Sequence, residues 1–140
     1  MVRWCSLASP TVQIIAALFV DDMQMRQVEG PATRIDLTGV QFSGVAPEPL
    51  PYTWTPHLCV LIHCPADHRA MSALTVEFEL DGEQVARNVQ PLQIEPGRFG
   101  RQLVRPEITF ERYDTVFARC RIDAGPVVSV PFTLLPPAAG

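Results

Sequence analysis

Histidine and cysteine, the residue types that most often bind zinc, gather in one short stretch of this chain. All three histidines and two of the four cysteines lie there: His57, Cys59, His63, Cys64 and His68. The run from 57 to 64 is rich in aliphatic residues, which is typical of a buried strand. On a strand, His57, Cys59 and His63 share one face, with the two histidines roughly 20 Å apart.

That separation is too large for one ion, because zinc–ligand bonds are only about 2.0–2.3 Å long. Neighbouring pairs, such as His57 with Cys59 or His63 with His68 around Pro65, remain the alternatives for a metal site. The favoured interpretation is a core strand with a buried cysteine and histidines at its ends. We therefore predict no metal and no cofactor.

The same spacing argues against a disulfide bond between Cys59 and Cys64. Five residues of strand separate them by about 16 Å, whereas bridged Cα atoms lie within about 7 Å. Cys5 and Cys120 have no assigned partner. Free, buried thiols are typical of a reducing compartment, so we predict a cytoplasmic protein.

Catalytic motifs are absent from the sequence. It contains no Gly-x-Ser-x-Gly, and Asp21-Asp22 and Glu77/Glu79 lack the density of oxygen ligands that calcium requires. We predict that the chain is not an enzyme. The alternative is a small-molecule or metal-binding domain, or an enzyme, with a pocket at one end that uses His57, Cys59, His63 or His68.

Two segments could contact a partner. The proline-dense stretch Pro47–Pro56 carries Tyr52 and Trp54, and prolines lower the entropy lost when aromatic side chains are presented to a partner. In the alternative interpretation, Trp54 folds back and fills one end of the domain.

The second segment holds arginines around an aromatic residue, between glycines that favour a flexible loop: Arg98, Phe99, Arg101 and Arg105. Arginines so spaced could bind an acidic partner, a phosphate or RNA. In the alternative, they are solvated side chains that pair with Glu107 and Glu111.

The elements that position these residues are strands. Apolar and polar residues alternate through Leu74–Val89 around Asp81-Gly82, which is the strongest short-range signal of a β-hairpin. A second hairpin is predicted from Val116 to Leu134, with its turn at Asp123–Gly125. Pro131 lacks an amide donor and predicts an edge or a break in its strand.

Further strands are predicted at Val12–Val20, Thr33–Phe42, His57–Cys64, Leu92–Ile94 and Ile108–Phe110. Seven to eight short strands without an amphipathic helix predict an all-β, antiparallel two-sheet sandwich, Ig-like or C2-like. A small closed barrel is the alternative. At 140 residues, the chain is expected to form one domain, with an ordered core from about 12 to 135.

Composition and charge limit the classes of function that are expected for this chain. The net charge of −4 disfavours general nucleic-acid binding, although six arginines against three acids make residues 98–121 locally basic. The apolar run Ile14–Val20 is too short to span a bilayer. All eleven basic residues are arginine, which we interpret as the mark of a GC-rich bacterial coding sequence.

The order of these segments resembles an uncharacterised bacterial family of similar length. The likeness rests on the string Ala16–Asp22, the strand Ile35–Val40, the loop Pro47–Pro56 with the strand Leu58–Ile62, and the hairpin Leu74–Val89. The resemblance covers Val12 to Leu134 and implies the fold, without an activity or catalytic residues. The chain departs from the family's pattern at its clustered histidines and at Arg98–Arg105.

The sequence therefore predicts a non-catalytic protein-interaction or assembly domain. It is expected to bind a protein partner or to self-associate, through a sheet edge or through its end loops. A structural subunit of a larger bacterial or phage assembly is a further alternative.

Overall fold

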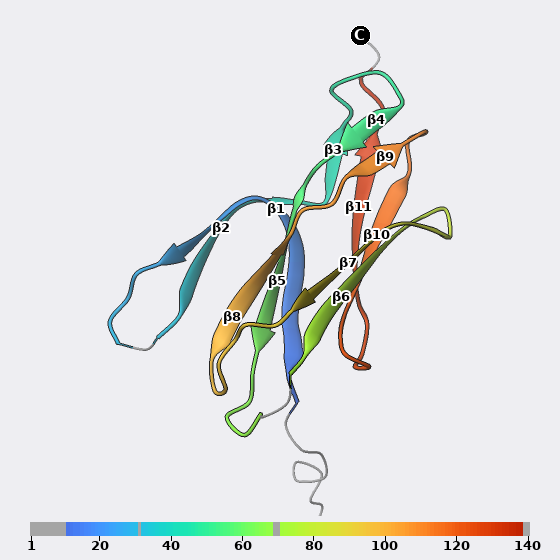
Figure 1. The fold of residues 1–140 in the computed structure, drawn as a ribbon. Helices are drawn as coiled ribbons and strands as arrows, with labels where there is room; N and C mark the ends of the chain where they lie inside the picture. The colour runs from blue at the N-terminus through green and yellow to red at the C-terminus, as the bar shows by residue number, and fades with distance from the viewer. Residues whose placement is uncertain (1–10, 31, 69–70, 139–140) are drawn as a thin grey trace, which may run out of the picture.

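The chain folds into strands that form two facing sheets (Figure 1). The computed structural model describes residues 11–30, 32–68 and 71–138, and the regular elements within them are all β-strands. The strands are β1 (Gln13–Arg26), β2 (Arg34–Gln41), β3 (Ser43–Val45), β4 (Tyr52–Trp54), β5 (His57–His63), β6 (Ala73–Leu80), β7 (Glu83–Pro91), β8 (Phe99–Val104), β9 (Ile108–Phe110), β10 (Thr115–Ile122) and β11 (Val128–Leu135).

Sheet A has the strand order β2-β1-β5-β8, and sheet B has the order β3-β11-β10-β6-β7. β4 and β9 form a small third sheet at the upper end of the molecule in Figure 1. Every pairing is antiparallel except that of β3 with β11, which is parallel. The predicted all-β, sandwich-like architecture is thus confirmed.

The alternative of a closed barrel is wrong, because among the described strands the two sheets share none and each keeps two edge strands. The strand count is also corrected, since residues 11–30, 32–68 and 71–138 form eleven strands where seven or eight were predicted for the chain. Three of them, β3, β4 and β9, are only three residues long. Elements of that length carry too few residues to show an alternating pattern.

The core lies between the sheets and follows the period-two pattern of the strands. Leu58, Val60 and Ile62 of β5 and the even-numbered residues of β10 are buried in one hydrophobic cluster. Alternate side chains of a strand point to opposite faces, so His57, Cys59 and His63 lie on the outer face of sheet A. The predicted division of β5 into two faces is confirmed.

Both predicted hairpins are present. Asp81 and Gly82 have φ values of 51° and 79°, as a tight turn with two positive φ angles requires. The second hairpin joins β10 to β11, where Pro131 pairs with Phe117. β3 contacts β11 only from Thr133 to Leu135, so none of the described strands pairs with Pro131 on that side, in keeping with the prediction.

β1 is longer than predicted, and its second half leaves the sandwich. Its pairing with β5 ends at Val20, whereas its pairing with β2 continues to Arg26. The segments Asp22–Arg26 and Arg34–Thr38 therefore form a two-stranded arm, which projects to the left in Figure 1. Residues 22–26, which lie between the predicted strands Val12–Val20 and Thr33–Phe42, belong to this arm.

Two predictions between β7 and β9 are wrong. Leu92–Ile94 is irregular, because β7 already ends at Pro91, and the arginine-rich segment is strand β8 where a flexible loop was predicted. Glycine at position 100 is required by packing: a Cβ there would lie 2.7 Å from Cγ1 of Ile94. Cys5 lies outside the described residues.

None of the described segments is a helix of the length and apolarity needed to cross a membrane.

Candidate functional site

The arginine- and phenylalanine-bearing segment lies on β8, an edge strand of sheet A. β8 pairs with β5 through registers such as His63 with Phe99 and Cys59 with Leu103. Since side chains alternate, the odd-numbered residues of β8 share the outer face of the sheet with the histidines of β5. The structure therefore brings Phe99 opposite His63 and Arg101 opposite Leu61.

Two contacts join the arginine-rich strand to these histidines. The rings of Phe99 and His63 lie 4.6 Å apart between centroids, and Phe99 is nevertheless 54% exposed. At the other end, a guanidinium nitrogen of Arg105 lies 3.0 Å from Nε2 of His57, whose Nδ1 lies 3.2 Å from the carbonyl oxygen of Asp21.

The hydrogen-bonding chemistry of these groups determines which ring nitrogen of His57 donates and which accepts. A guanidinium group only donates hydrogen bonds, so Nε2 must accept and Nδ1–H must donate to the Asp21 carbonyl. In this arrangement His57 orients Arg105 at the margin of the outer face.

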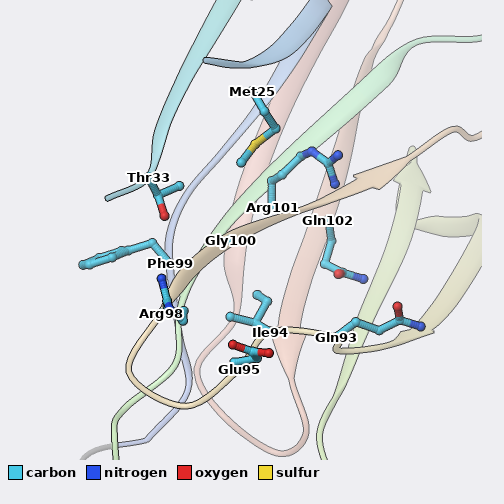
Figure 2. Close-up of a pocket in the computed structure, with 10 residues that line it drawn as sticks. All are labelled: Met25, Thr33, Gln93, Ile94, Glu95, Arg98, Phe99, Gly100, Arg101 and Gln102. Carbon is cyan, nitrogen blue, oxygen red and sulfur yellow. The ribbon is translucent and has the colours of Figure 1, made fainter. Parts of the chain in front are cut away.

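A pocket of about 560 Å³ opens beside β8 (Figure 2). Met25 of the arm and the nearby Thr33 line one side, and Gln93, Ile94 and Glu95 of the β7–β8 connection line the other. Between them lie Arg98, Phe99, Gly100, Arg101 and Gln102. The pocket therefore combines apolar side chains with two arginines and one carboxylate.

The arm that borders this pocket is amphipathic. Met23 pairs with Leu37 and Met25 with Ile35 on one face, while Arg26 and Asp36 form an ion pair of 3.0 Å on the other. Met25 is 50% exposed. An apolar side chain of this size, left exposed in a pocket wall, is a surface that a bound group could cover.

Trp54 lies in the core, which corrects the prediction that it is presented to a partner. It is 7% exposed and stacks on Phe132 of sheet B at 3.8 Å, and its ring also contacts Phe19 of sheet A at 5.0 Å. Tyr52 is half-buried and packs against the same cluster. The alternative interpretation, in which Trp54 fills one end of the domain, agrees with this position.

The histidines do not converge on a common point. His57 contacts Arg105, His63 contacts Phe99, and His68 lies with its Nε2 3.3 Å from the hydroxyl of Ser72. Within residues 11–30, 32–68 and 71–138, no group of three or more His, Cys, Asp or Glu side chains could hold a metal ion.

The described cysteines, Cys59, Cys64 and Cys120, are free and buried thiols. Burial raises the pKa of Cys120 to about 12. Burial also raises the pKa of Cys59, partly offset by the Arg101 guanidinium, and that of Cys64, partly offset by a backbone hydrogen bond from Gly97. Thiols held protonated in this way are poor nucleophiles.

The outer face of sheet B is different in kind. Its arginines pair with carboxylates on neighbouring strands, Arg119 with Glu79 at 3.1 Å and Arg87 with Glu77 at 3.6 Å. Such exposed pairs are typical of a solvated surface. On β8, by contrast, no described carboxylate forms an ion pair with Arg101 or Arg105.

Sequence reasoning missed the two residues that the arm contributes to the pocket, Met25 and Thr33. Met25 lies between two predicted strands and Thr33 begins the second of them, and nothing local indicates that the arm borders β8.

No protein-family model, curated protein or solved structure matches this chain. The resemblance to an uncharacterised bacterial family therefore stays a prediction.

Proposed function

We propose that this chain is a non-catalytic protein-interaction domain, and that it binds its partner along β8 and the adjoining pocket. The observation that carries the proposal is Phe99, which is 54% exposed on an edge strand with Arg98 and Arg101 on either side of it. Exposed aromatic and arginine side chains are the types enriched at the energetic centres of protein interfaces.

Charge indicates the kind of partner. The chain as a whole carries a net charge of −4, yet β8 and its flanks carry Arg98, Arg101 and Arg105 against Glu95. A positive patch on an acidic protein favours a partner with a complementary acidic surface and speeds their encounter. Self-association through this strand would bring like charges together.

We further propose a fold type, a source and a compartment for this protein. We take the fold to be of the Ig-like or C2-like type, supported by its four- and five-stranded sheets of mostly antiparallel strands. We also take the protein to be bacterial and cytoplasmic. The free thiols Cys59, Cys64 and Cys120 support a reducing compartment.

The proposal is tested by neutralising two matched sets of exposed arginines. A partner recovered from the host extract is purified, and its affinity for three proteins is measured by calorimetry. They are the wild type, Arg98→Gln/Arg101→Gln/Arg105→Gln, and the control Arg87→Gln/Arg112→Gln/Arg119→Gln, which removes the same charge from positions outside β8 and its flanks.

We expect the β8 variant to bind about tenfold or more weakly, since three charged contacts of about 0.5–1 kcal/mol each are lost. The control variant should bind as the wild type does. Equal affinity of all three proteins, or an equal loss in both variants, would refute β8 as the contact surface.

A further inference from the structure

Some backbone amides and carbonyls of β8 point toward β5 and the others point to the opposite side. Hydrogen bonds at both ends of β8 show which residues point in each direction. The carbonyl of Arg98 accepts a bond of 2.9 Å from the amide of Cys64, just beyond β5. The carbonyl of Leu103 instead accepts a bond of 3.1 Å from Nε2 of the Gln90 side chain, on the side away from β5.

Backbone groups alternate along a strand with a period of two. The amides and carbonyls of Gly100, Gln102 and Val104 therefore point toward β5, as the carbonyl of Arg98 does, whereas the amide of Arg98 donates to the carbonyl of Glu95. Those of Phe99 and Arg101 point outward with Leu103. The register agrees, because the side chains of directly opposite residues lie closest where the pair is not hydrogen-bonded, as in His63 and Phe99.

The outward edge is closed at Leu103 and open at Phe99 and Arg101. Gln90 covers Leu103, and Gln102 holds the Gln90 side chain in place through a bond of 2.9 Å. In the described chain, the amides and carbonyls of Phe99 and Arg101 face away from β5 and have no hydrogen-bond partner on that outward side. Both residues line the pocket beside the arm.

We infer that this pocket receives an extended acidic segment of a partner protein, which adds to sheet A as a strand alongside β8. The inference rests on the proposed function and states how the partner binds. Four backbone groups, the N–H and C=O of Phe99 and of Arg101, would pair with the added strand.

Charge complementarity selects an acidic segment. Arg101 lies on the outer face of β8, where carboxylates at alternate positions of an added strand could pair with it, while the apolar side chains between them face inward toward Ile94. A second copy of this chain fits less well, because two β8 strands placed side by side would bring their arginines together.

The test uses a fluorescein-labelled eight-residue peptide of alternating valine and glutamate, with an alternating valine and lysine peptide as control. Binding to the full chain is measured by fluorescence anisotropy. We expect only the glutamate peptide to bind, and its affinity to fall as salt rises. Failure of the glutamate peptide to bind, or binding of both peptides alike, would overturn the inference.

A pair of substitutions separates the backbone from the side chain. Arg101→Ala removes the charge and keeps the amide, whereas Arg101→Pro also removes the N–H that faces the open edge. The pairing with β5 does not use that amide, so both variants should fold. We expect Arg101→Pro to bind the peptide at least tenfold more weakly than Arg101→Ala, and equal affinities would overturn strand addition.

Wild-type protein supplies a check that does not depend on how the proline variant folds. Glutamate peptides N-methylated at alternate residues lose the donors of one edge only. We expect one methylation pattern to abolish binding and the other to preserve it. If both patterns bind equally while Arg98→Gln/Arg101→Gln/Arg105→Gln abolishes partner binding, the interaction surface stands and the added strand does not.

Discussion

Trp54 offers the sharpest test of how this domain is held together. Its indole stacks on Phe132 and contacts Phe19 and Phe110, so one side chain touches both sheets and β9. The perturbation is Trp54→Ala. Its control is Phe99→Ala, which removes an aromatic side chain that is 54% exposed on β8.

The magnitude follows from burial. A tryptophan buries roughly 150–250 Å², and Trp54 is only 7% exposed. At about 25 cal/mol per Å², the lost burial is worth about 4–6 kcal/mol as an upper bound. Large-to-small changes of this kind cost about 3–5 kcal/mol in practice, which is a large share of a typical stability of about 5–15 kcal/mol.

The free energy of unfolding is measured by guanidinium denaturation followed by far-ultraviolet circular dichroism. We expect Trp54→Ala to lose about 4 kcal/mol, with a melting temperature lower by roughly 10–15 °C. Phe99→Ala should lose less than about 1 kcal/mol, because half of its ring already faces solvent. A loss below about 1 kcal/mol for Trp54→Ala, or an equal loss in both variants, would contradict the inference that Trp54 stabilises the packing of the two sheets.

Three further predictions concern the thiols, the arm and the surface. The unfolded Cys120 thiol ionises near pH 9.0 and the folded one near pH 12, so the folded state keeps its proton while the unfolded state loses it. The contribution of Cys120 to the free energy of unfolding should therefore be constant below about pH 8 and fall between pH 9 and 12, by up to about 1.4 kcal/mol per pH unit. Denaturation of Cys120→Ala between pH 9 and 12 should show a shallower fall than that of the wild type. Gly39→Ala should lower the free energy of unfolding by about 1–2 kcal/mol, because Gly39 has a φ of 65° and an added Cβ would lie 2.9 Å from the Cβ of Asp21. A variant as stable as the wild type in denaturant would contradict this prediction. Arg119→Ala should cost less than about 1 kcal/mol, since its pair with Glu79 is exposed, and the difference from wild type should shrink at high salt.

Much of the fold was predictable because its signals are local. The turn Asp81-Gly82 needs positive φ angles that these two residue types adopt readily, and the alternation on both sides of it sets the pairing. The division of β5 into two faces was predictable for a similar reason, since side chains alternate along a strand.

β8 was not predictable in the same way. Gly97 and Gly100 in sequence indicate a flexible loop, yet Gly100 is there because Ile94 lies against its backbone. β8 is a strand because it pairs with β5, about forty residues earlier in the chain. That pairing is a long-range contact, which local composition does not encode.

The sequence by itself determined the strand period, the two hairpins and the residue types that could bind a partner, because these depend on neighbours in the chain. Only the tertiary structure decided which of those residues face solvent. It placed Trp54 between the sheets and Phe99 beside the arm. The physical reason is that burial depends on what packs against a side chain, and here the packing partners come from strands far apart in sequence.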